Sequence, residues 1–248
     1  MGFIRPIFGN RLYVCFVSLF SSVGVMNQLD YTIYREGPTK YKIVFSGCSE
    51  SLIKSIVYSR QIPDISVYND YRTITFSATS VQTYTEFRDG LLFESNGVRR
   101  LSYETTLGLI MSLASQLKYL IEKQSSCFYL FNTDNLIVID GTKFVYISNE
   151  HLGKLMPDDK MILLIQPFSK QETFISPELE RITSIPAKVD YRTSYYSLGA
   201  LALNCLSDET FDNNNNDTVF DALKGTKLYA MLKRCLAKEP CERTIMFV

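Results

Sequence analysis

The sequence predicts an α+β fold in two parts: a small β-rich N-terminal part and a larger, mainly helical C-terminal part. Short segments rich in β-branched and aromatic residues lie between about residues 31 and 93. After Gly97, apolar residues recur at helical spacing. Hydrophobic residues make up 46% of the chain and charged residues 21%, which is typical of a globular protein. We expect an apolar segment over residues 1–26, the first part over 27–95 and the second over 96–248.

The N-terminal part is predicted to form strands around one helix. Three segments have strand-like composition, with Gly, Pro and Asn between them: Tyr41–Ser46, Ile65–Tyr68 and Arg72–Ser77. Glu50–Arg60 interrupts them with four aliphatic residues on one helical face. A small sheet packed on this helix is therefore expected.

The C-terminal part is predicted to contain helices and one hairpin. Three segments have helical periodicity: Leu101–Lys123, Tyr195–Leu206 and Val219–Leu236. Ser102 is the expected N-cap of the first. Asn135–Ile139 and Lys143–Ile147 are short apolar runs on either side of Asp140-Gly141, a sequence that favours a hairpin turn.

Composition excludes several kinds of function. The chain has 26 basic and 26 acidic residues, and nucleic-acid or anionic-membrane binding usually needs a basic excess. His151 is the single histidine, so a catalytic triad or a multi-histidine metal site is not expected. No Cys-x-x-Cys pair occurs, which argues against structural zinc and for six separate thiols in a reducing compartment. The cysteines are Cys15, Cys48, Cys127, Cys205, Cys235 and Cys241.

The apolar segment Leu12–Val25 near the start of the chain has three possible interpretations. It is shorter than the roughly 20 apolar residues of a membrane-spanning helix. It follows Arg5 and Arg11 and has the length of a signal-peptide core. It could instead be a strand or helix packed on the domain, or lie upstream of a true start at Met26. The last two interpretations are favoured because its flanks fit a signal peptide poorly.

Four motifs, in order across about residues 101–245, give the chain a resemblance to a known family. Thr133–Val138, after the long predicted helix, resembles the end of the protein-kinase catalytic loop. Ser176-Pro177-Glu178 resembles the Ala-Pro-Glu motif, and Tyr195–Gly199 the start of the central helix of the C-lobe. Leu232–Thr244 is similar to the pattern near the end of the fold. The resemblance implies a protein kinase-like, two-lobed fold with a reduced β-rich N-lobe and a mainly helical C-lobe.

The resemblance also implies structural roles for four residues. Glu178 and Arg243 occupy the positions of an interior ion pair of the family, whose disruption would leave a buried charge unpaired. Gly199 matches the glycine of the central helix. Ser194 stands where the family has an Asp that opens that helix, so weaker anchoring of the catalytic loop is expected.

The catalytic residues that the resemblance implies are largely absent. Asn135 matches the magnesium-binding Asn, but Leu130 stands at the position of the catalytic Asp, which acts as general base. Ile147 or Ser148 stands at the Asp of the Asp-Phe-Gly motif, and neither binds magnesium as a carboxylate does.

The nucleotide-binding motifs of the N-lobe are also incomplete. No glycine-rich loop precedes residue 97. Lys42 or Lys54 could replace the nucleotide-binding lysine, with Glu50 as its partner, although a first-turn Glu is usually explained by the helix dipole.

Other carboxylates near the hairpin could replace the missing catalytic ones. Asp134, Asp140 and Glu150 are the carboxylates positioned to take over. Asp140 is explained by the turn itself, and Asp134 by a solvent-facing loop. His151 is expected to be solvated or locally hydrogen-bonded rather than catalytic.

Three functions remain open from the sequence. The favoured one is a catalytically inactive kinase-like domain, a pseudokinase, which binds a protein such as a kinase or a kinase substrate. It would need no cofactor and would contact neither nucleic acid nor membrane. The second is an atypical active protein kinase that uses ATP and Mg²⁺, with Asn135 and Lys42 at its site. The third is a secreted or membrane-associated binding module.

The expected location is intracellular. The asparagine run Asn213–Asn216 and the composition suit an AT-rich genome. Compact degenerate kinase-like chains occur in large DNA viruses, which would place the protein in the host cytoplasm.

Two further expectations concern aromatic and apolar side chains. Phe128, Tyr129 and Phe131 would fill the groove between the lobes, and an apolar patch would lie beneath Met246–Val248.

Overall fold

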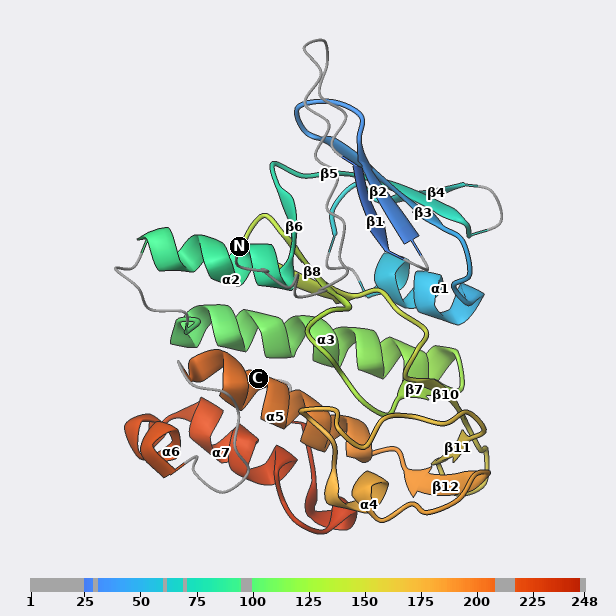
Figure 1. Cartoon of the computed structure of the whole chain (residues 1–248), viewed down its shortest axis with the longest axis vertical. Helices are drawn as coiled ribbons and strands as arrows, with labels where there is room; N and C mark the ends of the chain where they lie inside the picture. The colour runs from blue at the N-terminus through green and yellow to red at the C-terminus, as the bar shows by residue number, and fades with distance from the viewer. Residues whose placement is uncertain are drawn as a thin grey trace, which may run out of the picture.

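A computed structural model describes residues 25–28, 31–59, 62–68, 71–94, 100–207 and 217–245. Figure 1 shows a β-rich N-terminal part at the top, with the helices of the C-terminal part stacked below it. The predicted α+β class is confirmed. The segment over residues 12–24 and the end Met246–Val248 lie outside the described residues, as do the predictions that concern them.

The N-terminal part is an antiparallel five-stranded sheet with one helix against it. The strands are ordered β1 (Val25–Gln28), β2 (Tyr31–Arg35), β3 (Lys40–Phe45), β5 (Thr73–Ser77) and β4 (Ser66–Tyr68). Alternate residues of β3, Tyr41, Ile43 and Phe45, are buried, as the period of a strand requires. The helix α1 (Glu50–Tyr58) buries Leu52, Ile53 and Ile56, and Ser49 caps its N-terminus. The three predicted strands and the predicted helix agree with β3, β4, β5 and α1 within two residues, whereas β1 and β2 were not predicted as separate strands.

The C-terminal part is built on two long helices that pack on each other, α3 (Tyr103–Lys123) and α5 (Thr193–Leu206). Ser102 caps α3 as predicted, because its hydroxyl accepts a hydrogen bond from the amide of Thr105. α4 (Pro177–Glu180), α6 (Asp217–Leu223), α7 (Lys227–Cys235) and the 3-10 turn Pro240–Glu242 complete the helical layer.

The predicted helix Val219–Leu236 is divided into α6 and α7. Gly225 between them has a φ of 81°, a conformation that glycine adopts without strain. Thr226 then accepts a hydrogen bond from the amide of Tyr229 and begins a new helix. The apolar period continues across the break, so periodicity alone did not detect it.

The connection between the two parts includes residues 81–94, which lie on the N-terminal side of the predicted boundary. β6 (Val81–Thr83) pairs with β8 (Leu136–Ile139), and α2 (Tyr84–Glu94) packs on both. The hydroxyl of Tyr84 also lies 2.9 Å from the Sγ of Cys205 on α5. These contacts associate residues 81–94 with the C-terminal part, although the sequence pattern assigned them to a strand-rich N-terminal one.

Two small sheets surround the helices. β8 and β9 (Lys143–Tyr146) form the predicted hairpin, with Asp140 and Gly141 at φ values of 51° and 65° in the turn. The second sheet was not predicted. It has the order β12 (Ala187–Asp190), β11 (Met161–Leu164), β10 (Leu152–Leu155) and β7 (Ser126–Phe128).

A buried glutamine connects the two parts. The side-chain amide of Gln116 on α3 donates to the Oγ of Ser55 on α1 at 3.0 Å and to the carbonyl oxygen of Tyr146 at 2.8 Å. Its carbonyl oxygen accepts from the amide of Tyr146 at 3.1 Å. One side chain therefore joins α1, α3 and β9.

The five described cysteines are free thiols, in agreement with the prediction of unpaired cysteines. Cys15 lies outside the described residues. Burial raises the pKa of Cys127 and of Cys235 to about 12 and that of Cys205 to about 11, whereas Cys241 is exposed.

Thiol modification should therefore be selective. Because the thiolate is the nucleophile, iodoacetamide at pH 8 should modify the exposed Cys241 before the three buried thiols, Cys127, Cys205 and Cys235, which should stay unmodified until the chain unfolds. Mass spectrometry of the peptides before and after urea measures the order. Modification of the three buried thiols in the native protein at the rate of Cys241 would contradict this arrangement.

Within the described residues, no helix combines the length and the hydropathy that a bilayer crossing requires.

Candidate functional site

The loop between β7 and β8 carries the residues that resemble a kinase catalytic loop. Leu130, at the position of the catalytic Asp, has a relative exposure of 0%. Its neighbour Phe131 is also buried, and the amide of Phe131 donates to the Oγ of Ser197 on α5 at 2.8 Å. The loop is therefore anchored to α5, with Leu130 buried in the core.

Phe128 and Phe131 surround the ring of Tyr146 from β9, with centroids 4.8 and 5.2 Å from it. Tyr129 instead packs on His151, at a centroid distance of 5.4 Å, and on Phe168. All three predicted groove-filling residues are buried, but their ring contacts lie within the C-terminal part.

Tyr31 of β2 is buried, and titratable residues of both parts act on its hydroxyl. Burial raises the pKa of its hydroxyl, and the neighbouring Cys48, Glu86 and Asp134 raise it further. The hydroxyl has no hydrogen-bond partner among the described residues. Tyr31 therefore extends from the N-terminal sheet toward the loop that carries Asp134.

Asn135 contacts a carboxylate that the sequence places 15 residues away. Its side-chain amide donates to the Oε2 of Glu150 at 3.1 Å, and Asn132 donates to the same oxygen at 3.4 Å. The Oδ1 of Asn132 in turn accepts from the backbone amide of Asn135 at 3.1 Å. Asn135 thus positions Glu150, one of the carboxylates that the sequence analysis considered as a replacement for the missing catalytic ones.

His151 and Glu172 lie beside Glu150. One ligand atom from each of the three side chains lies within 4.8 Å of the other two. His151 is only 2% exposed, and its Nδ1 is 3.1 Å from the hydroxyl of Tyr146. The prediction of a locally bonded histidine is therefore correct, whereas a solvated one is excluded.

The electrostatics of this cluster follow from burial and from like charges. Burial lowers the pKa of His151, although the negative charge of Glu150 opposes the shift. Burial raises the pKa of Glu172, and the negative charges of Glu150 and Asp134 raise it further. Sequence analysis did not detect Glu172, because it comes from the irregular segment between β11 and α4.

The residues after β9 are hydrogen-bonded to the N-terminal part. Asn149 accepts from the amide and hydroxyl of Ser49, at 3.0 and 2.8 Å, and donates to the carbonyl oxygen of Gly47. Ile147 and Ser148 are both buried, and Ser148 Oγ accepts from the amide of Glu150. At the position of the Asp-Phe-Gly carboxylate, the chain therefore has a buried serine whose hydroxyl bonds its own backbone.

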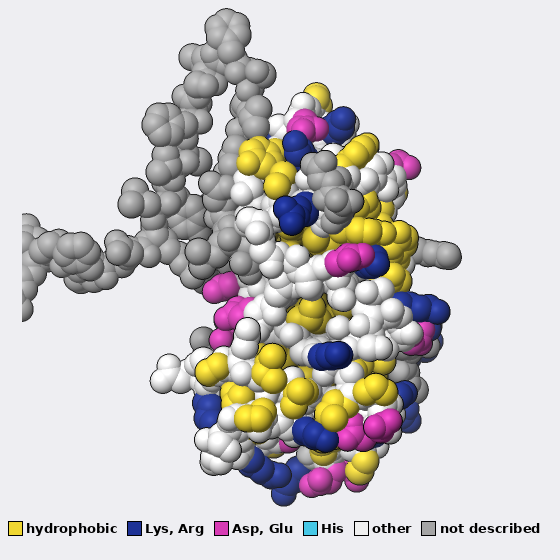
Figure 2. All heavy atoms as spheres, turned by 90° about the vertical axis from the view of Figure 1, so that its right-hand side faces the viewer, with side chains coloured by type: hydrophobic (Ala, Val, Ile, Leu, Met, Phe, Trp, Pro, Cys, Tyr) yellow, Lys and Arg dark blue, Asp and Glu magenta, His cyan; other side chains and the backbone are white. Residues whose placement is uncertain are grey.

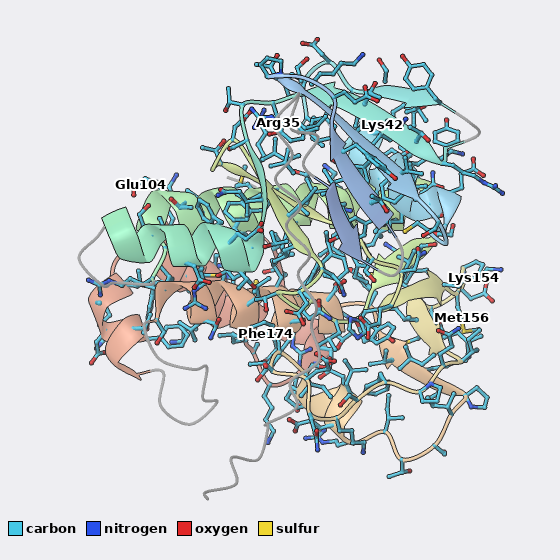
Figure 3. The ribbon with its side chains drawn as sticks, turned by 45° about the horizontal axis from the view of Figure 1, so that its top comes forward. Arg35, Lys42, Glu104, Lys154, Met156 and Phe174 are labelled. Atoms are coloured by element: carbon cyan, nitrogen blue, oxygen red, sulfur yellow. The ribbon has the colours of Figure 1, made fainter. Side chains whose placement is uncertain are left out.

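Lys42 does not approach Glu50. Its Nζ lies 3.6 Å from the Oε1 of Glu36 and 5.9 Å from the ring centroid of Tyr34. Figure 3 shows Lys42 in the N-terminal sheet, well separated from Phe174 in the segment before α4. Glu50 pairs with Lys54 at 2.6 Å within one turn of α1, a local pair on a largely exposed helix start. A lysine–glutamate pair therefore forms, but not between β3 and the helix.

Asp140 connects the hairpin to the end of the N-terminal sheet. Its Oδ1 accepts from the amide and hydroxyl of Thr79, both at 2.7 Å, and from the amide of Ser80 at 3.1 Å. Burial acts to raise the pKa of Asp140, but these hydrogen bonds outweigh it and lower the pKa. Its role is structural, as the Asp-Gly turn indicated.

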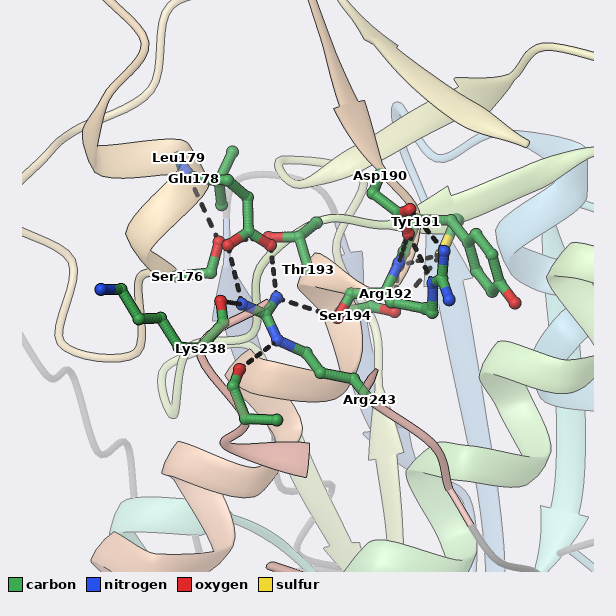
Figure 4. Close-up of polar contacts among 12 residues, drawn as sticks. Ser176, Glu178, Leu179, Asp190, Tyr191, Arg192, Thr193, Ser194, Lys238 and Arg243 are labelled. Atoms are coloured by element: carbon green, nitrogen blue, oxygen red, sulfur yellow. Dashed lines mark hydrogen bonds and ion pairs between the residues drawn. The ribbon is translucent and has the colours of Figure 1, made fainter. Parts of the chain in front are cut away.

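Glu178 and Arg243 form the interior ion pair that the resemblance implied. The Nη1 of Arg243 contacts Glu178 Oε1, and Nη2 donates to Oε2 at 2.9 Å (Figure 4). Arg243 has a relative exposure of 0%, and its remaining donors bond the carbonyl oxygens of Ala237, Lys238 and Arg192. Its guanidinium also lies 5.0 Å from the ring centroid of Tyr196. The charge is therefore fully compensated.

The start of α5 holds the catalytic-loop region through serines. Ser194 is buried and donates to the carbonyl oxygen of Tyr191, while Cys127 of β7 contacts its Oγ. Ser197, which sequence analysis did not select, accepts from Phe131 and so anchors the loop. A Cβ on Gly199 would lie 2.7 Å from the Cβ of Cys235, so this glycine permits the close packing of α5 on α7.

These residues do not fit the magnesium–nucleotide complex that a kinase fold implies. Leu130 replaces the general base, and the buried Ile147 and Ser148 offer no carboxylate. Lys42 is paired with Glu36. Asn135 matches the magnesium-binding Asn in the sequence motif alone, and its side-chain amide is bonded to Glu150.

No protein-family model matches the chain, and no curated protein matches it in sequence. Among solved structures, the crystal structure of a rhoptry kinase from Toxoplasma gondii is similar, with a TM-score of 0.51 and 13% sequence identity. The match covers 88% of this chain and 72% of that chain. Identity at this level shows the fold and nothing of the activity. The chain therefore has a protein kinase-like fold.

Proposed function

We propose that the chain is a kinase-like domain that does not catalyse phosphoryl transfer and that acts by binding another protein. The observation that supports this most is the burial of Leu130 at the position of the general base. An enzyme of this family requires a carboxylate there that reaches the substrate hydroxyl. Leu130 has no carboxylate, and it lies fully buried on a loop that is hydrogen-bonded to α5. Residue 130 therefore cannot act as the general base in this structure.

The contrast between retained packing and absent chemistry supports the same conclusion. The Glu178–Arg243 pair and the close contact at Gly199 both maintain the fold. The general base, the Asp-Phe-Gly carboxylate and a Lys42–Glu50 pair are all missing. A domain selected to fold but not to transfer phosphate would keep the first set and lose the second.

The proposed partner is a protein, either a kinase or a kinase substrate, within the cell. The face drawn in Figure 2 carries interspersed acidic and basic side chains with apolar ones between them. Such a mixture suits a protein surface better than a polyanion. The absence of nucleic-acid and membrane partners, the location and a viral origin remain predictions.

An active phosphotransferase is the second candidate, because one observation favours it. Glu150 lies next to Asn135, so a carboxylate is available beside the residue that would bind magnesium. This candidate requires nucleotide, whereas the first requires none.

Thermal unfolding with ATP and Mg²⁺ separates the two candidates. We expect no rise in the unfolding temperature up to millimolar ATP with Mg²⁺, because Lys42 and Glu50 are engaged elsewhere. A ligand at 100 times its Kd would stabilise the fold by about 2.7 kcal/mol, which is readily measured. A magnesium-dependent rise that Asn135→Leu abolishes would instead support the phosphotransferase.

A further inference from the structure

The cluster of Glu150, His151 and Glu172 has a composition that neither the fold nor the proposed binding function requires. Two carboxylates and one imidazole place their ligand atoms within 4.8 Å of one another. Two of the residues follow β9, and the third comes from the segment between β11 and α4. We propose that these three side chains bind a divalent transition-metal ion, with Zn²⁺ the best match, and that the ion ties these two segments together.

The charge of the cluster supports a cation. Among the described residues, neither Glu150 nor Glu172 pairs with a lysine or an arginine. Glu172 is only partly exposed, so the repulsion between the two carboxylates is incompletely screened by water. A bound cation would compensate the charges of Glu150 and Glu172, as Arg243 compensates the charge of Glu178.

The setting of His151 supports a metal site. The ring is only 2% exposed, and an imidazole nitrogen is among the commonest metal ligands. The hydroxyl of Tyr146 fixes the ring through Nδ1, at 3.1 Å. Metal-binding histidines commonly have such a second contact, which sets the orientation of the ring.

Glu150 is held in the same way. Asn132 and Asn135 both donate to Oε2, which leaves Oε1 available. Hydrogen bonds of this kind orient a ligating carboxylate. In this account Asn135 is a positioning residue for Glu150 and not a ligand of a nucleotide-bound magnesium ion.

The ligand types select the metal. Imidazole with carboxylates is a common Zn²⁺ set, whereas Mg²⁺ prefers oxygen ligands alone and keeps most of its waters. Around tetrahedral Zn²⁺, ligand atoms lie about 3.4 Å apart, given metal–ligand distances near 2.1 Å. The three ligand atoms lie no more than 4.8 Å apart, so each pair would need to close by at most about 1.4 Å to reach this geometry. The exposed side chain of Glu150 can supply the movement.

The test is a zinc titration of the whole chain without nucleotide, in a Cys241→Ser background that removes the exposed thiol. Isothermal calorimetry should give one Zn²⁺ per chain, with Mn²⁺ weaker and Mg²⁺ weaker still. Glu150→Gln and Glu172→Gln should each weaken Zn²⁺ by at least about tenfold. The matched control is Glu104→Gln, in the first turn of α3, which Figure 3 shows away from Phe174; it should bind as the parent does.

A second readout needs no metal. In a chelating buffer, Glu172→Gln should raise the unfolding temperature, because it removes one of two neighbouring like charges. In saturating Zn²⁺ the order should reverse, with the parent the more stable. The proposal is overturned if the parent binds no Zn²⁺, if both Gln variants bind it as the parent does, or if binding requires ATP. Because the titration contains no nucleotide, its outcome is independent of the proposed loss of phosphoryl transfer.

Discussion

Replacing Glu178 by alanine should destabilise the chain by about 3–5 kcal/mol, because the charge of Arg243 would remain buried without its partner. The guanidinium has a relative exposure of 0%, so water cannot replace the lost carboxylate without opening α4 or the segment after α7. Its bonds to the carbonyl oxygens of Ala237 and Lys238 satisfy some donors but do not neutralise the charge. Urea unfolding followed by far-UV circular dichroism measures the change.

Two controls give this result its meaning. Asp221→Ala breaks a pair with Lys224 in which both side chains are 65% exposed, and it should cost no more than about 1 kcal/mol. The double variant Glu178→Leu with Arg243→Met should be more stable than Glu178→Ala alone, because no buried charge is left. A loss below 1 kcal/mol for Glu178→Ala would mean that the pair is not buried as described.

Placing a carboxylate at Leu130, as protein kinases have at this position, should destabilise the fold rather than activate the chain. Leu130→Asp removes a core side chain, for which about 2–5 kcal/mol is typical of a change to alanine. It also places a carboxylate where the exposure is 0%, at a further cost of several kcal/mol if it is ionised. Leu130→Asp should therefore be less stable than Leu130→Ala at pH 7.5.

The pH dependence separates the charge from the cavity. Burial would raise the pKa of the introduced Asp above its unfolded value of about 3.9. The charge penalty is then full above the raised pKa and decreases as the pH falls toward 4, because the folded state takes up the proton first. The gap in unfolding free energy between the Asp and Ala variants should narrow from pH 7.5 to pH 5. A constant gap, or phosphoryl transfer by the Asp variant, would contradict the buried position of residue 130.

Much of the fold follows from local patterns in the sequence. The helix over residues 103–123 has a strong apolar period and a serine cap, and the hairpin has its Asp-Gly turn, so both were predicted within two residues. α2 was missed because its aromatic residues resemble a strand. The sheet of β7, β10, β11 and β12 was missed because its strands have four residues or fewer, and because two of its three pairings, β7 with β10 and β11 with β12, join strands more than 20 residues apart.

The residues of the candidate site also fall into those that local motifs predicted and those that only the tertiary structure brings together. Motif positions identified Leu130, Asn135, Glu178 and Arg243, because each has a fixed place in a conserved order of family motifs. The partners of Asn135 could not be predicted in this way. Glu150 and Glu172 reach the cluster only through the tertiary course of two irregular segments. Ser197 and Gln116 were missed for a different reason: serine and glutamine on a helix give no signal that they bond the backbone of another element.

The most direct measurement of the central claim is transfer of the γ-phosphate of labelled ATP by the purified chain, with Mg²⁺ and separately with Mn²⁺. We expect no label on the chain itself or on a general protein substrate, and no release of phosphate above that of buffer. Asn135→Leu and Lys42→Met should give the same background as the parent. Transfer that exceeds background in the parent and is lost in Asn135→Leu would contradict the account and establish an active site built around Asn135.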